Sequence, residues 1–250
     1  RGIFPFSSSF FSAFLKYYFK SSLGHKRKSR LRLGMQSLVM RFETWEPLYQ
    51  EILEDFGFSR SRDLEAAELL SDLLRGRKSQ LSAAETLLWG RRAKVCGNAP
   101  SLARELEERH GEPDDDAALL AADGAVAVLL EQGIVPDILV TDLDGPFPAI
   151  LKANQMGCIV AVHAHGDNLA ALESYVPLLD RIIGTVQCRP PEGLYNFGGF
   201  TDGDRAVFLA REMGAASIEL VGFDFEDQSV TPRKKKKLAW AKKLIDLALS

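Results

Sequence analysis

Two aspartates that stand two residues apart, Asp142 and Asp144, form the pattern in this chain that best fits metal chemistry. They follow a short apolar run, and on an extended segment residues two apart point to the same side. Two such carboxylates can share a hard cation such as Mg²⁺, which phosphoryl-transfer sites bind through one or two carboxylates plus substrate phosphates. The alternative is a pair that only stabilises a turn. Proline and glycine residues on both sides constrain the loop, so the spacing favours a magnesium site.

Two earlier turns contain candidate ligands for a nucleotide. The segment Gly97-Asn98-Ala99-Pro100-Ser101 leads into a predicted helix, whose first N–H groups and dipole attract phosphate, so Gly97, Asn98 and Ser101 are candidate phosphate-binding residues. An ordinary strand-to-helix turn fits equally well, because no further glycines complete a dinucleotide-binding motif. Asp123 ends the next apolar run and either caps a helix or contacts a ribose or a metal.

Polar clusters after the fourth and fifth apolar runs are candidate substrate contacts. His165, Asp167 and Asn168 close the fourth run, and Gln187 closes the fifth. His163 and His165 alone do not indicate zinc, which needs a third protein ligand. Asp167 and Asn168 could instead cap the next helix, and Gln187 could face solvent.

Two later segments complete the candidate site. Phe197 and Phe200 flank a glycine pair close to Asp202, which suits a pocket that stacks a flat heterocycle, although a capped helix start with core aromatics is the alternative. Asp224 ends the sixth run and is a further substrate candidate. Lysines at a helix start oppose the dipole and therefore suggest a nearby anion, so Lys234 and Lys237 are candidates for binding a polyphosphate.

The elements that must position these residues alternate along the chain. Strands are predicted over 93–96, 117–122, 138–141, 158–164, 181–187 and 217–221, with helices over 101–109, 125–132, 148–155, 169–179, 205–213 and 234–249. Such alternation is typical of an α/β fold, here a doubly wound, mainly parallel six-stranded sheet. Ligands bind beyond the carboxyl ends of such strands, where the polar clusters lie.

Before the first strand the periodicity is helical. Trp45, Leu48 and Ile52 belong to an apolar stripe, a second helix is predicted over 63–74, and a capping box places the start of a third at Ser82. We predict a small helical cap over 43–92 and an α/β catalytic domain over 93–250. Residues 1–42 are expected to be disordered or translated from upstream of the true start, because Met35 and Met40 stand just before the first helix.

Charge and cysteine content exclude some classes of function. Nine of the 31 basic residues precede Glu43, the first acidic residue, so the remainder holds 22 basic against 34 acidic side chains, which argues against a nucleic-acid-binding protein. The apolar run over 10–19 is too short to cross a bilayer. Three cysteines without metal or disulfide spacing fit a reducing cytoplasm. A homodimer is compatible with the sequence.

Six segments carry long motifs: Val95–Leu102, Ala122–Ala125, Pro136–Gly145, Ala164–Asn168, Phe197–Ala206 and Leu220–Asp224. In this order they resemble the archaeal 6-hydroxymethyl-7,8-dihydropterin pyrophosphokinase family, from about Trp45 to the C-terminus. The resemblance implies a magnesium-dependent enzyme that transfers pyrophosphate from ATP to the hydroxymethyl group of a reduced pterin and releases AMP, in methanopterin or folate biosynthesis. It also implies that Asp142 and Asp144 hold Mg²⁺, while Asp202 assists the metal or orients the hydroxyl.

Three alternatives stay open at this point. Thiamin pyrophosphokinases are similar in a sparser pattern, but this chain has Gly145 where they usually carry serine, and it ends without room for their extra β-sandwich domain. Flagellin-modifying glycosyltransferase-like proteins are also similar, and their Asp-x-Asp motif can hold a metal on a nucleotide sugar. A non-catalytic module that binds ATP and Mg²⁺ is the third alternative, although a pure binder has little need for acidic residues that face an anionic ligand.

Overall fold

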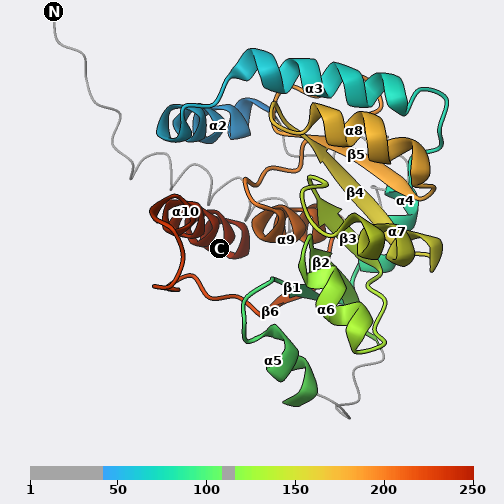
Figure 1. Ribbon diagram of the computed structural model, residues 1–250, viewed down its shortest axis with the longest axis vertical. Coiled ribbons are helices and arrows are strands. Elements are labelled where there is room, and N and C mark those ends of the chain that lie inside the picture. The colour runs from blue at the N-terminus through green and yellow to red at the C-terminus, as the bar shows by residue number, and fades with distance from the viewer. Residues whose placement is uncertain (1–41, 109–115) are drawn as a thin grey trace, which may run out of the picture.

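The centre of the molecule is a six-stranded parallel sheet, seen in a computed structural model that describes residues 42–108 and 116–250 (Figure 1). The strand order is β5-β4-β3-β2-β1-β6, and every neighbouring pair is parallel. The strands are β1 (Arg92–Cys96), β2 (Ala118–Ala122), β3 (Ile138–Thr141), β4 (Ile159–Ala164), β5 (Ile182–Val186) and β6 (Ser217–Val221). The predicted sheet is therefore confirmed, with ends that shift by one residue at most.

The helices cover both faces of this sheet. They are α5 (Leu102–Glu108), α6 (Ala125–Glu131), α7 (Phe147–Gln155), α8 (Leu169–Tyr175), α9 (Asp202–Glu212) and α10 (Pro232–Leu249), with a 3₁₀ turn over Val176–Leu178. The strands β1 to β5 advance in one direction, so right-handed crossovers place α5 to α8 on one face. The step from β5 to β6 runs back across the sheet, and α9 packs on β1, β2, β3 and β6, with α10 against it (Figure 1). The predicted double winding is confirmed.

Within the described residues, three helices precede the sheet: α2 (Phe42–Phe56), α3 (Arg60–Leu73) and α4 (Leu81–Leu88). Trp45, Tyr49 and Leu70 are fully buried in the same apolar core as the strands, and α3 packs on β4, β5 and α8. The predicted capping box at Ser82 is wrong, because α4 already begins at Leu81, whose N–H donates to Ser79 Oγ at 3.3 Å. The division into cap and catalytic domain stays a prediction. The segment expected to be disordered, 1–42, is wrong at its last residue, because Phe42 already belongs to α2; residues 1–41 lie outside the described residues.

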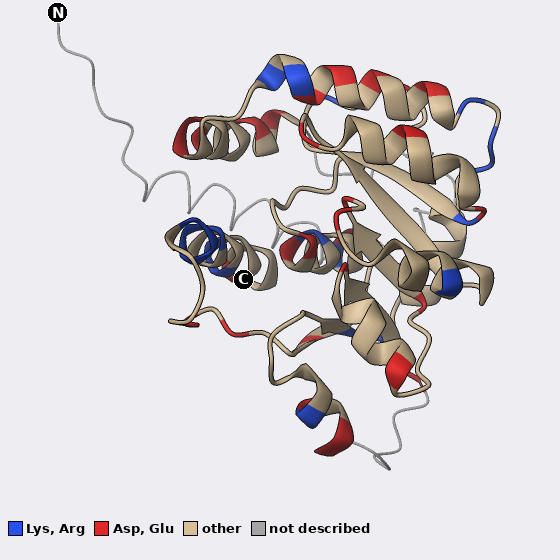
Figure 2. Cartoon of the chain, in the orientation of Figure 1, with Lys and Arg blue, Asp and Glu red and all other residues tan. Residues whose placement is uncertain are grey.

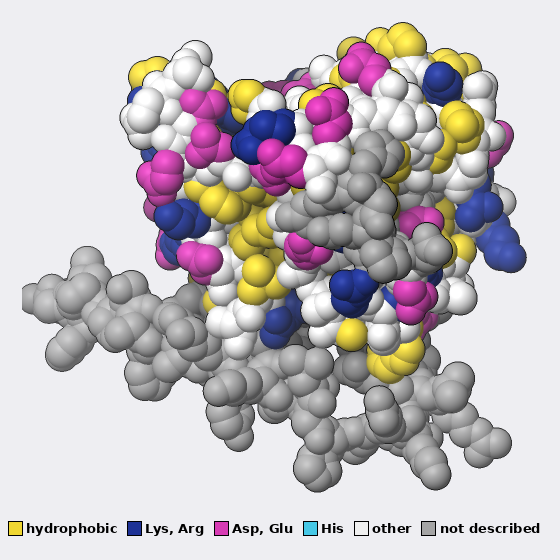
Figure 3. Space-filling view, turned by 90° about the horizontal axis from the view of Figure 1, so that it is seen from below, with side chains coloured by type: hydrophobic (Ala, Val, Ile, Leu, Met, Phe, Trp, Pro, Cys, Tyr) yellow, Lys and Arg dark blue, Asp and Glu magenta, His cyan; other side chains and the backbone are white. Residues whose placement is uncertain are grey.

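Burial is most complete in the middle of the sheet. Every residue of β3, β4 and β5 is buried, as expected of parallel strands covered on both faces. The edge strand β6 alternates between exposed and half-buried positions. Seen from below (Figure 3), the described surface carries acidic and basic side chains close to hydrophobic ones. None of the helices in the described ranges has the length and apolar character that crossing a membrane requires.

Candidate active site

A cavity of about 770 Å³ lies at the carboxyl ends of the strands, beneath the N-terminal part of α10. A cavity of this size accommodates a ligand the size of a nucleotide or larger. All but two of the predicted site residues line it: Gly97, Asn98, Asp123, Asp142, Asp144, His165, Asp167, Asn168, Gln187, Phe200, Asp202, Asp224, Lys234 and Lys237. The exceptions are Ser101 and Phe197. The parallel sheet thus gathers polar clusters that are up to about half the chain apart.

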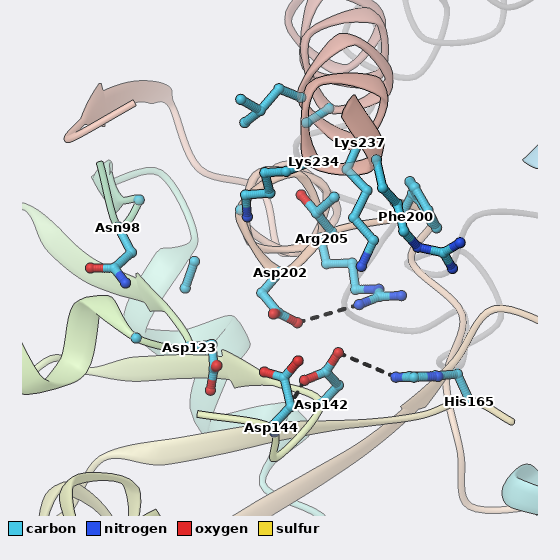
Figure 4. Close-up of a pocket in the computed structure, with 18 of the residues that line it drawn as sticks. Asn98, Asp123, Asp142, Asp144, His165, Phe200, Asp202, Arg205, Lys234 and Lys237 are labelled. Atoms are coloured by element: carbon cyan, nitrogen blue, oxygen red, sulfur yellow. Dashed lines mark hydrogen bonds and ion pairs between the residues drawn. The ribbon is translucent and has the colours of Figure 1, made fainter. Parts of the chain in front are cut away.

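Three carboxylates converge on the floor of this cavity. One oxygen each of Asp123, Asp142 and Asp202 lies within 4.8 Å of the other two, close enough for one ion (Figure 4). Asp123 follows β2, Asp142 follows β3, and Asp202 opens α9. Asp144 lies beside Asp142, but the closest group of three contains Asp123 and Asp202 instead. Sequence spacing indicated the pair on one loop, whereas the fold adds carboxylates from two other elements.

Asp123 reaches this group through a strained turn. Its φ angle is +21°, and its Oδ1 accepts a hydrogen bond of 2.6 Å from Thr141 Oγ1 on the neighbouring strand. The residue at the cap position of α6 is Gly124, so the alternative that Asp123 caps this helix is wrong. A Cβ atom at Gly145 would lie 2.3 Å from Asp123 Oδ2. Glycine at 145 therefore leaves the space that the Asp123 carboxylate needs.

Two residues of the β4–α8 loop hold Asp142. His165 Nε2 lies 3.2 Å from Asp142 Oδ2, within hydrogen-bond distance. Asn168 Nδ2 donates to the backbone carbonyl of Asp142 and to that of His163, both at 2.7 Å. Asn168 occupies the cap position of α8 but its side chain makes no capping hydrogen bond. The polar atoms of His165 and Asn168 are thus used to position a carboxylate.

A chain of hydrogen bonds holds Asp202 from the opposite direction. Arg205 Nη1 donates to Asp202 Oδ1 at 3.3 Å, and Arg205 Nη2 donates to Gln187 Oε1 at 3.3 Å. Gln187 Nε2 donates to Asp63 Oδ2 at 2.8 Å. The buried Asp63 also accepts hydrogen bonds from Tyr49 and from the backbone N–H of Gly166. Gln187 therefore faces protein groups, and not solvent.

Sequence reasoning missed Asp63 and Arg205 as site residues. Both carry a signal that could have found them. Asp63 stands on the buried stripe of α3 with Ala66, Ala67 and Leu70, a helical spacing that otherwise holds only apolar side chains. Arg205 follows two aspartates at a helix start, and it is itself buried. A charged residue at a buried position needs partners, so each is a candidate for a buried polar network.

The start of α9 differs from the prediction. The helix begins at Asp202, not at Arg205, because Thr201 and Asp204 form a reciprocal capping box. Asp204 Oδ1 accepts from the backbone N–H of Phe200, and Asp204 Oδ2 accepts from that of Thr201 at 3.0 Å. This cap fixes the first turn, so Asp202 points into the cavity from a rigid element (Figure 4).

The two phenylalanines before α9 have different roles. Phe200 lines the cavity, but Phe197 does not: its buried ring stacks on Tyr195, with centroids 5.9 Å apart. Residues two apart on an extended segment point to the same side, so the Phe197 ring lies beside that of Tyr195. Gly198 and Gly199, both with positive φ, then redirect the chain before Phe200. The expectation that Phe197 lines a substrate pocket is therefore not met.

Crowding of the carboxylates changes their protonation. Burial, and then the neighbouring Asp144 and Asp142, raise the pKa of Asp123 to about 7. Burial and the charge of Asp142 raise the pKa of Asp202 well above its usual range. Although burial acts to raise it, the pKa of Asp142 is held well below its usual range by the hydrogen bond from His165 and the charge of Arg205. A divalent cation would relieve this repulsion, and an all-oxygen donor set fits Mg²⁺.

Basic residues of α10 face these carboxylates across the cavity. Arg233, Lys234 and Lys237 line the cavity, whereas Lys235 donates to Gln228 and Lys236 pairs with Asp55. Figure 2 shows the basic residues gathered at the N-terminal part of α10, and Figure 4 shows Lys234 and Lys237 above the carboxylates. Among the residues that the structure describes, the three that line the cavity form no ion pair. They are available for an anionic ligand.

Comparison with known proteins shows the family of this chain. Residues 67–229 match the family model described as 6-hydroxymethylpterin diphosphokinase MptE-like. The chain belongs to this family. It is 44% identical over 221 residues to the 6-hydroxymethyl-7,8-dihydropterin pyrophosphokinase of Methanothermobacter thermautotrophicus, and 42% identical over 223 residues to that of Pyrococcus furiosus. Each alignment covers 83% of this chain and 94% of the relative.

Another family member, the pyrophosphokinase of Methanocaldococcus jannaschii, is 36% identical over 231 residues. Among solved structures, the MAf glycosyltransferase of Magnetospirillum magneticum AMB-1 matches 67% of this chain and 29% of its own, with a TM-score of 0.40 and 16% identity. That structural likeness is too low to support an argument about function.

Proposed function

We propose that this protein transfers pyrophosphate from ATP to the hydroxymethyl group of 6-hydroxymethyl-7,8-dihydropterin and releases AMP, in methanopterin or folate biosynthesis. Family membership supports the reaction, because the curated relatives are named as pyrophosphokinases of this pterin. The observation that carries the proposal is the group of carboxylates from Asp123, Asp142 and Asp202. It faces three cations of α10 that form no ion pair with another described residue and line the same cavity.

The carboxylates and the cations have complementary tasks in this reaction. Asp123, Asp142 and Asp202, with Asp144 beside them, would hold Mg²⁺, which when bound offsets the charge of phosphate oxygens. Lys234, Lys237 and Arg233 would neutralise the charge of the triphosphate from the opposite wall. Phosphoryl transfer depends mainly on alignment and charge stabilisation, so positioned charges account for most of the required catalysis.

Neighbouring side chains keep two of these carboxylates charged or correctly oriented. His165 and Arg205 keep Asp142 ionised, and the capping box of α9 fixes the direction of Asp202. The cavity also has room for the pterin beside the nucleotide. Since the carboxylates lie on the floor of the cavity (Figure 4), the hydroxymethyl group of the pterin and the phosphates of the nucleotide can meet above them.

The test is a product assay on the full chain with ATP, MgCl₂ and 6-hydroxymethyl-7,8-dihydropterin, with the nucleotides separated by chromatography. Pterin-dependent AMP supports the proposal. ADP instead of AMP would mean transfer of a single phosphate, and unchanged ATP would favour a nucleotide-sugar enzyme or a binding protein. Omission of the pterin, and chelation of the metal with EDTA, are the controls that separate transfer from hydrolysis and establish the need for Mg²⁺.

A further inference from the structure

The cavity has an aromatic wall at each end, with the carboxylates between them. Phe58 and Phe200, whose ring centroids are 6.2 Å apart, form one wall, and Phe223 and Phe225, 5.6 Å apart, form the other. We call these the Phe200 end and the Phe223 end. Figure 4 shows Phe200 and His165 on one side of the carboxylates and Asn98 on the other. Two flat ligands can therefore each stack on one wall.

Two of the three cavity-lining cations of α10, Arg233 and Lys237, lie at the Phe200 end. The Arg233 guanidinium lies 5.4 Å from the centre of the Phe58 ring, and Lys237 Nζ lies 5.9 Å from the centre of the Phe200 ring. Neither residue forms an ion pair with another described residue, and the Arg205 side chain also points into this part of the cavity (Figure 4). An extended triphosphate is the ligand group that such a set of cations favours.

Three polar side chains at the Phe200 end, Gln187, Asn168 and His165, already have protein partners. Gln187 is held between Asp63 and Arg205, and Asn168 donates to two backbone carbonyls. His165 faces Asp142 through Nε2, and its Nδ1 accepts from the backbone N–H of Asp167 at 3.3 Å. These side chains hold Asp142 and, through Arg205, Asp202 in place. To form hydrogen bonds with the edge of a heterocycle, they would have to give up these contacts.

The Phe223 end has one cation, Lys234, which Figure 4 shows on the Asn98 side of Asp202, and it also has polar side chains with free atoms. Asp224, between the two aromatic rings in sequence, uses Oδ1 to accept from the backbone N–H of Glu226 at 3.0 Å. Its Oδ2 accepts no hydrogen bond from any described residue, and neither does the side chain of Asn98 form one within the described ranges. The Phe223 ring packs against both Gly97 and Gly203, where a Cβ atom would approach it within 3.0 Å. The wall is thus rigid and carries free polar atoms.

The pterin ring and the adenine ring of ATP differ in the hydrogen bonds that they can form with a carboxylate. The pyrimidine edge of a reduced pterin presents an amino group next to a ring N–H, two parallel donors that a carboxylate accepts together. The amino group of adenine is flanked by a ring nitrogen with a lone pair, which a carboxylate repels.

From these observations we infer that the reduced pterin binds at the Phe223 end with Asp224 on its amino edge, while the nucleotide lies at the Phe200 end with its phosphates under Arg233 and Lys237. This inference rests on the proposed function and assigns the two substrates to opposite ends of one cavity. It reverses the expectation from sequence that Phe200, His165 and Gln187 contact the pterin and that Gly97 and Asn98 contact phosphate.

The test measures binding of each ligand separately, without turnover. Calorimetry with α,β-methylene-ATP and MgCl₂ gives the nucleotide affinity, and quenching of pterin fluorescence gives the affinity for 6-hydroxymethyl-7,8-dihydropterin. The variants are D224N at the Phe223 end and K237M at the Phe200 end. E226Q and K235M are matched controls, since Glu226 pairs with Lys242 and Lys235 bonds Gln228, both outside this cavity.

D224N is expected to weaken pterin binding about tenfold or more and to leave nucleotide binding within about twofold, because one charge-assisted contact is lost. K237M is expected to do the reverse, and both controls should match the wild type. The opposite pattern, or equal loss of both ligands in either variant, overturns the assignment. A further outcome is that the wild type binds both ligands, D224N loses mainly the pterin and K237M mainly the nucleotide, but no AMP forms. In that case the assignment of the two ends stands and the proposed reaction fails.

Discussion

Gln187 Nε2 donates a hydrogen bond of 2.8 Å to Asp63 Oδ2, across 124 positions of the chain. This bond fixes the direction of the Gln187 amide, whose Oε1 then accepts from Arg205, the partner of Asp202. The other oxygen of Asp63 accepts from the N–H of Gly166, next to His165, the partner of Asp142. One buried carboxylate on α3 therefore supports two of the three converging aspartates.

The variant D63N should disturb both of these supports. The NH2 group of an asparagine faces one of two donors. If it faces Gln187 Nε2, the Gln187 amide must flip and turn its own donors toward Arg205; if it faces the Gly166 N–H, the hydrogen bond to Gly166 is lost. We expect a loss of kcat of about tenfold or more, because buried charge-assisted hydrogen bonds are each worth about 1.5–3 kcal/mol, and a higher Mg²⁺ requirement. The measurement is initial rate against MgCl₂ concentration.

The matched control is Y49F, which removes one hydrogen bond to the same Asp63 oxygen and leaves both supports intact. Y49F should lower the melting temperature but keep kcat and the Mg²⁺ dependence close to those of the wild type. Equal Mg²⁺ dependence in D63N and the wild type would show that Asp63 contributes to stability alone.

The relative importance of Asp142 and Asp144 can be measured directly. D142N should lose most turnover, about a hundredfold or more, while its circular dichroism spectrum stays native, because Asp142 belongs to the converging group and is the carboxylate kept ionised. D144N should lose less, since Asp144 lies outside the closest three. Turnover at varied MgCl₂ is the readout. If D144N were the more damaging change, the pair on one loop, and not the group of three, would hold the metal.

The sequence was a good guide where a single segment determines its own structure. The strands around Val140 and Val162 are continuous apolar runs bounded by polar turns, so their type and ends followed from local pattern. The parallel arrangement then placed most candidate residues at one edge, as expected. Asp142 was found for the same reason, since the Asp-x-Asp spacing that indicates a metal site lies within one loop.

Features that depend on distant contacts were missed. Nothing near Asp63 in sequence shows that Gln187 and Gly166 are its partners, because the fold alone brings α3 to the ends of β4 and β5. Phe197 and Phe200 look equivalent in sequence, but two glycines with positive φ between them send the rings in different directions. The start of α9 was placed too late because the local pattern did not show that Asp204 caps this helix through the backbone N–H groups of Phe200 and Thr201.

Gly145 should be essential for the position of Asp123. The Cβ atom in G145A would lie 2.3 Å from Asp123 Oδ2 and 2.7 Å from its Cγ, so the carboxylate must leave the converging group. We expect the MgCl₂ concentration for half-maximal activity to rise about tenfold, with a smaller change in melting temperature. A double-mutant cycle with D123A is the control, because G145A should have little further effect once the carboxylate is absent. Additive effects would mean that Gly145 acts elsewhere.

The stability of the metal-free protein should fall as the pH rises. Burial and neighbouring carboxylates raise the pKa of Asp123 in the folded state to about 7, above its ordinary value near 4 in the unfolded chain. The folded state therefore binds this proton more tightly, and the stability that protonation provides is lost between about pH 4 and pH 7. Melting temperatures in EDTA should accordingly be higher at pH 5.5 than at pH 8, and Mg²⁺ should raise the melting temperature more at pH 8, where the carboxylates are ionised. The control for this pH effect is D123N, which removes the titrating group. Because that group is absent, the melting temperature of D123N in EDTA should depend less on pH than that of the wild type. An unchanged pH dependence would show that other groups cause the loss of stability.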